Sequence, residues 1–243
     1  RLVQLEDRYA DLLIEAAVIC GAVPIGVQRA RPRIDLNRDP REIDPAMIEG
    51  PLPRDMIATV RTRSGLGLIP RRIGNGPQLV RRRLAASEVE ERIRLVHTPY
   101  HAAIAEALTG TRARFGTALL LDCHSMPPVA GPNPRERPDV VIGDRYGRSA
   151  ATALGDRLES AIRAQGLKTA GNTPYAGGYT LDRHGRPDEG IHALQIEFDR
   201  SLYLDAKLDQ PGSGIDRVRR IFNMLFDILA EECDPGSNRI AAE

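Results

Sequence analysis

The chain has 243 residues and a mass of 26.7 kDa, which suits one large α/β domain better than two small ones. Its apolar content of 42% is enough for a sizeable core, and 34 basic against 33 acidic residues leave a net charge of +1. This balance gives no electrostatic argument for a nucleic-acid or membrane partner, so we expect neither.

The cysteines and the apolar runs indicate the cellular compartment of the protein. Cys20, Cys123 and Cys233 are scattered and odd in number, so no disulfide framework or Cys-x-x-Cys zinc site is expected. No apolar run reaches about 18 residues, and no signal peptide is visible. We therefore expect a cytoplasmic protein. The chain starts at Arg1, already in a helical pattern, and we expect that residues before it are missing.

The first eighty residues alternate one helix with irregular segments. Apolar residues at 2–16 recur at helical spacing, and Gly21 fits a cap at the end of this helix. Residues 22–27 are a short strand candidate, which a proline weakens. Residues 29–45 are rich in Arg, Asp and Pro, and 51–76 are rich in Pro, Gly and Arg. Both are expected to be loops.

A long helix is expected next, over residues 87–108. Ser87 and Glu90 have the spacing of a capping box at its start. Pro99 lies inside this stretch and should kink or break the helix, because proline lacks a backbone N–H.

The second half alternates short apolar segments with helical ones. In chain order, these are a strand at 115–121, a strand at 140–143, a helix at 149–165, a strand at 194–198 and a helix at 215–231. Such alternation predicts an α/β fold with a mostly parallel or mixed central sheet and helices on both faces. With no convincing linker, we expect a single domain over residues 1–243.

Asp122-x-His124 follows the apolar strand directly. Open α/β sheets bind their ligands at the carboxyl ends of strands. An imidazole at that position is a candidate metal ligand or catalytic base, and a carboxylate two residues away could orient it. The alternative is an ordinary hydrogen-bonded histidine at a strand end.

Glu197 ends the last predicted strand, in the run Gln195-Ile-Glu197. A buried glutamate without a partner is costly, so it needs a reason to be there. Beside a metal and its water, the carboxylate would be a good general base. The alternative is a structural ion pair with Arg200.

The loop at 35–40 offers cationic and amide groups for an anionic ligand. Arg38 could bind a substrate carboxylate with two hydrogen bonds, and Asn37 could add a donor. Arg31 and Arg33, just upstream, could stabilise an oxyanion. The alternative is a solvated loop with internal salt bridges.

A further polar segment, NTPYAGGYT at 172–180, contains two glycines that allow close backbone approach. Its polar groups, with the two residues that follow nearby, could line a small pocket. The candidates are Asn172, Tyr175, Gly178, Tyr179, Thr180, Arg183 and His184. The alternative is a glycine turn with aromatic packing.

His97 and His101 are four residues apart, a spacing that can hold zinc on a helix. No glutamate follows His97 as in the helical zinc-protease motif, and Pro99 interrupts the pair. We therefore expect both histidines to support a site indirectly or to have structural roles.

Several motifs in one order resemble the N-formylglutamate amidohydrolase family. They are LEDRY at 5–9, IDLNRDP at 34–40, GLGLIP at 65–70, PYH at 99–101, DCHSMP at 122–127, NTPYAGGYT at 172–180 and LQIE at 194–197, with Arg200 and Tyr203 after the last. The resemblance implies a fold related to the zinc carboxypeptidases and aspartoacylases. It also implies hydrolysis of N-formyl-L-glutamate to formate and L-glutamate, a late step of one histidine-degradation route. The expected partner is therefore a small-molecule N-acyl amino acid.

The resemblance also implies site residues. Asn37 and Arg38 match the aspartoacylase run whose arginine holds a substrate carboxylate. His124 resembles a later histidine ligand of zinc, or of another divalent metal, and Glu197 resembles the catalytic glutamate. Arg31 or Arg33 would steady the oxyanion.

The remaining metal ligands are less directly implied. Aspartoacylases supply two from a His-x-x-Glu motif that this sequence lacks. In the family, an early Pro-His-Ser-Gly-like segment is expected to supply one histidine, and it would precede Arg1. The other ligand would be Asp7 or Glu6, with Asp7 preferred. Two alternatives stay open: a zinc deacylase or peptidase for another N-acyl amino acid, and a non-catalytic carboxylate-binding relative.

Overall fold

The computed structural model describes residues 5–28, 31–51, 55–72, 78–79, 82–130 and 136–232. Their contacts divide the chain into two compact units. The loop unit comprises the described residues of Arg1–Glu6, Ile25–Ile104 and Gly178–Thr180. The sheet unit comprises those of Asp7–Pro24, Ala105–Gly177 and Leu181–Glu243. A single domain over 1–243 stays a prediction.

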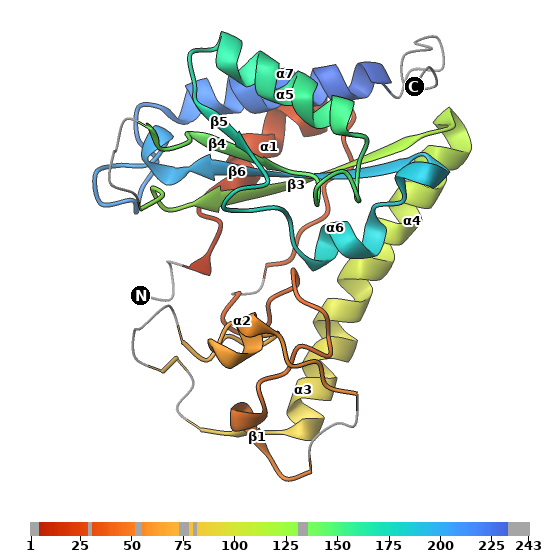
Figure 1. The fold of residues 1–243 in the computed structure, drawn as a ribbon, viewed down its shortest axis with the longest axis vertical. Helices are drawn as coiled ribbons and strands as arrows, with labels where there is room; N and C mark the ends of the chain where they lie inside the picture. Colours follow the sequence, from red (N-terminus) through yellow and green to blue (C-terminus); the bar gives the residue numbers. More distant parts are fainter. Residues whose placement is uncertain are drawn as a thin grey trace. The chain divides into compact units, whose positions relative to one another are not determined.

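The sheet unit contains a four-stranded sheet in the order β3-β6-β4-β5 (Figure 1). β3 (Ala118–Met126) runs parallel to β6 (Ile191–Asp199), and β4 (Val140–Gly143) runs antiparallel to β6. β5 (Thr169–Gly171) pairs parallel with β4. The sheet is therefore mixed, within the range of the prediction, and the predicted strand at 140–143 is confirmed.

One face of this sheet carries the main apolar core. The helices α1 (Ala10–Ile19), α5 (Thr152–Ala164) and α7 (Ile215–Glu232) pack on it, and Figure 1 shows α5 and α7 along that face. Leu154 and Leu158 lie one helical turn apart on α5 and are almost fully buried. Each such side chain contributes roughly 1.5–3 kcal/mol when it leaves water.

The opposite face of the same strands is polar because successive side chains alternate across a strand. Leu121 and Cys123 of β3 pack against the core, so Asp122 and His124 point away from it. On β6, the core takes Leu194, Ile196 and Phe198, and the intervening Gln195 and Glu197 point away. The polar motifs predicted from the sequence thus share one face.

The loop unit has short elements around a smaller core. They are η2 (Pro45–Met47), β1 (Ile48–Glu49), α2 (Val60–Arg63), β2 (Leu84–Ala85), α3 (Ala86–Arg92) and the π-helix η3 (Ile93–His97), followed by the start of α4 (Thr98–Phe115). β1 and β2 form a two-stranded parallel sheet. The core residues are Ile34, Ile43, Met47, Ile48, Leu68, Ile69, Leu84 and Val89.

Several predicted elements differ from the structure. The helix predicted from a capping box of Ser87 and Glu90 begins at Ala86, and Glu88 is the residue that accepts the hydrogen bond from the N-cap backbone, at Ala85. Residues 22–27 form no strand, because the segment makes no ladder and contains Pro24. The strand predicted at 115–121 is Ala118–Met126 in the structure, so Asp122 and His124 lie within the strand rather than after it. It begins later than predicted because α4 continues to Phe115 and ends before Gly116, whose φ is +83°. The first helix begins at Ala10, after Tyr9 in a left-handed conformation; residues 1–4 lie outside the described part.

The expected interruption of the long helix is real, but its form differs. The π-helix η3 ends two residues before Pro99, and α4 contains Pro99 in its first turn. The helical backbone continues from η3 into α4, because Thr98 is in helical conformation and its N–H donates to the carbonyl of Ile93. The chain therefore has a π-helical turn next to Pro99 rather than a break.

The remaining elements are short: α6 (Tyr179–His184), η5 (Pro187–Glu189) and η6 (Arg200–Leu202). Among the described residues, no helix combines the length and the apolar character needed to cross a bilayer.

Candidate active site

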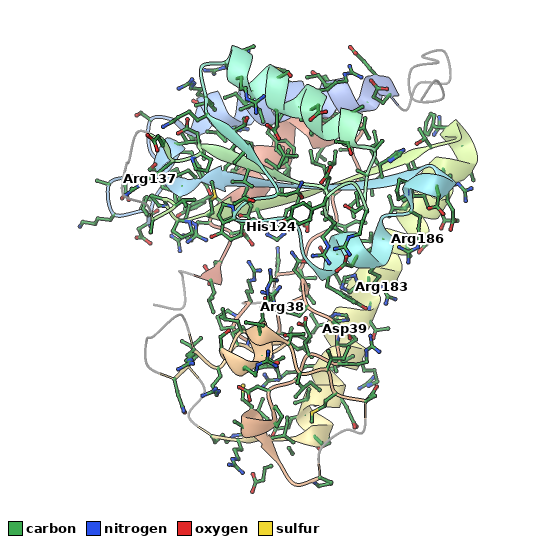
Figure 2. All side chains as sticks on the ribbon, in the orientation of Figure 1. Arg38, Asp39, His124, Arg137, Arg183 and Arg186 are labelled. Atoms are coloured by element: carbon green, nitrogen blue, oxygen red, sulfur yellow. The ribbon has the colours of Figure 1, made fainter. Side chains whose placement is uncertain are left out.

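His124 lies between two carboxylates on the polar face of the sheet (Figure 2). Its Nδ1 is 3.0 Å from Oδ2 of Asp7, which precedes α1. Its Nε2 is 2.9 Å from Oδ2 of Asp122, which is an ion-pair distance. That oxygen is buried, and the geometry between it and the ring nitrogen is not that of a good hydrogen bond. Burial alone would lower the pKa of His124, but the charges of Asp122 and Asp7 outweigh it and raise the pKa well above 6.5. The two carboxylates therefore favour the protonated form of the imidazole, whereas a histidine that binds a metal must be deprotonated.

A hydrogen-bond network fixes the carboxylate of Asp7. Its second oxygen accepts a hydrogen bond from the backbone N of Ser125 at 2.9 Å. The buried guanidinium of Arg200 donates to Oγ and O of Ser125, at 3.1 and 3.2 Å. The hydroxyl of Tyr203 donates to the carbonyl of Arg8 at 2.6 Å, which holds the segment that carries Asp7.

No role was predicted for Ser125 within the DCHSMP motif, and Arg200 was predicted only as a residue of the family motifs or as an ion-pair partner of Glu197. The adjacency of Ser125 to His124, and the position of Arg200 three residues after Glu197, were the available signals.

Glu197 lies beside His124 on the neighbouring strand. The two residues are register partners in the parallel pair of β3 and β6, so their side chains point to the same face. Glu197 is 8% exposed, and Nε2 of Gln195 donates to its Oε1 at 2.9 Å. An amide donor suits an ionised carboxylate, which is the form that a general base requires.

Tyr175 approaches this cluster from the segment after β5. Burial raises its pKa, the charge of Glu197 raises it further, and the charge of Arg200 opposes both. The segment crosses β4 closely, because a Cβ on Gly143 would lie 2.7 Å from the carbonyl carbon of Ala176. Tyr175 therefore lies within electrostatic range of Glu197, and its role in binding substrate stays a prediction.

Other members of the 172–184 segment have different surroundings. The side chain of Asn172 is engaged with Asp144 and with the backbone of Tyr146, so it stabilises the turn after β4. Arg183 is exposed on α6 (Figure 2). Burial, together with Arg183 and Arg186, lowers the pKa of His184 to about 4.

In the loop unit, Arg38 is held by its own surroundings. Its Nε donates to the carbonyl of Leu66 at 3.0 Å and its Nη1 to that of Asn37 at 2.7 Å. Asp35 lies 3.7 Å from Arg38 and 3.2 Å from Arg31, so one buried carboxylate joins the two arginines. Burial would raise the pKa of Asp35, but the charges of Arg31 and Arg38 outweigh it and lower the pKa.

The other predicted cation, Arg33, lies elsewhere in the loop unit. It lines a groove with Leu95 and Tyr100, and its carbonyl accepts a hydrogen bond from Arg92. Of the two upstream arginines, Arg31 is therefore the one linked to Arg38. The roles of both stay predictions.

Asn37 contacts the segment 172–180, which was predicted as a substrate pocket or a glycine turn. Its Oδ1 accepts a hydrogen bond from the backbone N of Thr180 at 2.9 Å, which orients the amide. A Cβ on Gly178 would overlap that side-chain amide, so only glycine allows this approach. Gly178 and Tyr179, both predicted to bind substrate, thus contact Asn37.

Gly178→Ala should therefore displace the amide of Asn37. We expect the free energy of unfolding to fall by about 1–3 kcal/mol, and thermal unfolding measures the effect. Gly110→Ala in α4 is the matched control, because among the described residues no atom lies within 4 Å of a Cβ added there. The control should raise stability slightly. A Gly178→Ala variant with unchanged stability would contradict the close approach.

Two groups among the described residues have the chemistry and spacing that a zinc ion would need. Nδ1 of His124 and Oδ2 of Asp7 are 3.0 Å apart, close to the edge of about 3.3 Å expected for a tetrahedron with bonds of about 2.0–2.1 Å. Asp122 on the other ring nitrogen fits the carboxylate that commonly orients a zinc-bound histidine. No group of three candidate ligands forms within the part of the chain that the structure describes. Of the two carboxylates predicted as a ligand, Asp7 is the one shown in contact with His124. The choice between Asp7 and Glu6 stays a prediction.

The α/β fold, with an imidazole, a metal-competent carboxylate and a buried glutamate on the polar face of its sheet, is that of a hydrolytic enzyme. The family model described as N-formylglutamate amidohydrolase matches residues 1–204. The chain belongs to this family.

Named relatives and solved structures agree with this assignment. The N-formylglutamate deformylase of Pseudomonas aeruginosa is 33% identical over 204 residues, covering 82% of this chain and 71% of the relative. That of Pseudomonas putida is 29% identical over 206 residues, covering 82% and 70%. The crystal structure of N-formylglutamate amidohydrolase from Ralstonia eutropha JMP134 has a TM-score of 0.88 and 35% identity, covering 96% of this chain and 85% of that one.

Proposed function

We propose that this enzyme hydrolyses N-formyl-L-glutamate to formate and L-glutamate in a metal-dependent reaction. The proposal rests on the contact between Asp7 and His124, and on the position of Glu197 as the register partner of His124 on the neighbouring strand. The names of the relatives support the substrate.

His124 and Asp7 would hold the metal, with zinc the first candidate and another divalent ion the alternative. Such an ion would supply Lewis acidity toward the formyl carbonyl and would acidify a water molecule near neutral pH. Asp122 would orient the ring of His124, and Ser125 would orient the carboxylate of Asp7. This ligand chemistry supports a relation to the zinc carboxypeptidases.

Glu197 would act as the general base and then as the general acid. Its carboxylate takes a proton from the water that attacks the formyl carbon, and Gln195 holds the carboxylate in place meanwhile. The same proton then goes to the departing nitrogen of glutamate as the carbon–nitrogen bond breaks. One group thus serves both transfers.

Arg38 would bind a carboxylate of the glutamate moiety, and Asn37 would add an amide donor. The bonds to Leu66 and Asn37 restrict the guanidinium of Arg38, so little side-chain entropy is lost on binding. Arg31 would stabilise the oxyanion, and Tyr175, Tyr179 and Arg183 would line the substrate site. Their residue types suit an anionic ligand.

Arg38→Ala should raise the KM for N-formyl-L-glutamate by about 10–100-fold, because a charge-assisted hydrogen bond contributes about 1.5–3 kcal/mol. Steady-state formate release measures KM and kcat. Arg63→Ala is the control: this exposed arginine of α2 contacts only the carbonyl of Ala58 among the interactions described for it, so KM should stay within about twofold. An unchanged KM for Arg38→Ala would remove the proposed role of Arg38.

A substrate panel tests the proposed activity itself. Formate or acetate release would be compared for N-formyl-L-glutamate, other N-formyl amino acids and N-acetyl amino acids, using full-length protein. We expect the highest kcat/KM for N-formyl-L-glutamate. Preference for another N-acyl amino acid would replace the substrate but keep the hydrolase, and no turnover with no bound metal would indicate a carboxylate-binding relative. A cytoplasmic role in histidine degradation is part of the same proposal.

A further inference from the structure

Two buried histidines of the loop unit bind the backbone on both sides of Asn37. Nε2 of His97 lies 2.9 Å from the carbonyl oxygen of Arg38, and Nε2 of His101 lies 3.0 Å from that of Leu36. Because a carbonyl oxygen only accepts, both Nε2 atoms must carry a proton and donate it.

Together with one bond from Arg38, these two bonds restrain three consecutive carbonyl groups of the loop. The carbonyl of Leu36 accepts from His101, that of Asn37 accepts from Nη1 of Arg38, and that of Arg38 accepts from His97. The backbone that carries Arg38 is therefore fixed by side chains rather than by a sheet or helix. Without such bonds, a loop of this kind has many accessible conformations.

The histidine rings are themselves closely packed. Their exposed fractions are 2% and 1%, and their centroids are 4.4 Å apart. The ring of Tyr179 lies 5.6 Å from His97 and 5.1 Å from His101. The three rings form a block behind the loop, with few alternative rotamers.

The helix geometry places the two imidazoles on this loop. His97 is the last residue of the π-helix Ile93–His97, and His101 follows in the first turns of α4. π-helical turns are rare and occur frequently at functional sites. The Nε2 atoms of both histidines are occupied by carbonyl groups, so the pair does not present the zinc-binding arrangement that its spacing allows.

We infer that His97 and His101 are positioning residues for Arg38. His97 contacts the carbonyl of Arg38, and His101 contacts that of Leu36, two residues earlier. Together they hold the root of the Arg38 side chain in the orientation that binds a carboxylate. The inference rests on the proposed role of Arg38. A small displacement of a positioning group is enough to lower activity about 100-fold, so loss of either bond should weaken substrate binding strongly.

A graded set of variants at His97 tests the inference. His97→Gln keeps an N–H near the position of Nε2, His97→Asn is too short to reach the carbonyl, and His97→Leu removes the donor. We expect KM for N-formyl-L-glutamate, and the calorimetric Kd for L-glutamate, to rise about 10–100-fold in the Asn and Leu variants. The Gln variant should stay within about threefold, and kcat should change less than KM.

A double-mutant cycle separates positioning from a general structural role. In an Arg38→Ala background, His97→Leu should add less than about twofold to KM, because it acts through Arg38. His192→Leu is the matched control. This side chain is only 3% exposed and accepts a hydrogen bond from the backbone N of Ala151, so its loss should lower Tm without changing KM.

Two results would overturn the inference while leaving the proposed role of Arg38 intact. One is a normal KM in both the Asn and Leu variants. The other is a double variant whose increase in KM equals the product of the increases caused by His97→Leu and Arg38→Ala separately. If the Leu variant does not fold, the comparison of Asn with Gln decides. An Arg38→Ala enzyme with unchanged KM would overturn both the inference and the proposed role of Arg38.

Discussion

Glu197→Gln is expected to lower kcat for N-formyl-L-glutamate by about 10²–10⁴-fold, the usual contribution of a general base. Glutamine has the same shape and keeps an oxygen that can accept the hydrogen bond from Gln195. It cannot take a proton, so the loss should fall on kcat, with KM changed by less than about threefold. Steady-state kinetics, thermal unfolding and metal analysis of the same sample measure the effect.

A surface carboxylate provides the control for this variant. Glu189 forms a 3.7 Å ion pair with Arg112, and both side chains are about half exposed. Glu189→Gln should leave kcat within about twofold, because such exposed pairs contribute little. If Glu197→Gln kept more than a tenth of the wild-type kcat with a normal fold, another group would have to be the base.

His124→Asn is expected to abolish both metal binding and turnover. The imidazole is the proposed nitrogen ligand next to Asp7, and its loss also removes the ring that lies between the carboxylates of Asp7 and Asp122. We expect the metal content to fall from about one to below about 0.1 per chain, with kcat reduced more than about 10³-fold. Elemental analysis of dialysed protein measures the first quantity directly.

The matched control for His124 is His192 on β6, a buried histidine with a backbone contact. His192→Asn should keep full metal content even if it lowers Tm. A His124→Asn protein that binds one metal ion as tightly as wild type would show that the ion is held elsewhere.

The regular elements with the strongest local patterns were predictable from the sequence. The strand Val140–Gly143 and the helix Ile215–Glu232 agree closely with the predicted ranges. β5 was missed because it has only three residues and ends in glycine. The π-helix Ile93–His97 was missed because hydrophobic periodicity does not distinguish one extra residue in a turn from a kink.

The site was predictable only in part, for a similar reason. That Asp122, His124 and Glu197 follow apolar residues is a local pattern, and the sheet brings them to one face. The contact between Asp7 and His124 joins residues 117 positions apart, and only the family resemblance pointed to it. Hydrogen bonds such as that from Arg200 to Ser125 leave no periodic signal in the sequence.

The most direct test of the metal-dependent mechanism measures formate release from N-formyl-L-glutamate by one preparation of full-length enzyme. The rate is measured before chelation, after removal of the metal, and after one equivalent of zinc is returned. We predict that turnover disappears with the metal and returns with it. Undiminished turnover by protein shown to contain less than about 0.05 metal ions per chain would contradict the account, because a site of the proposed kind has no activity without its ion.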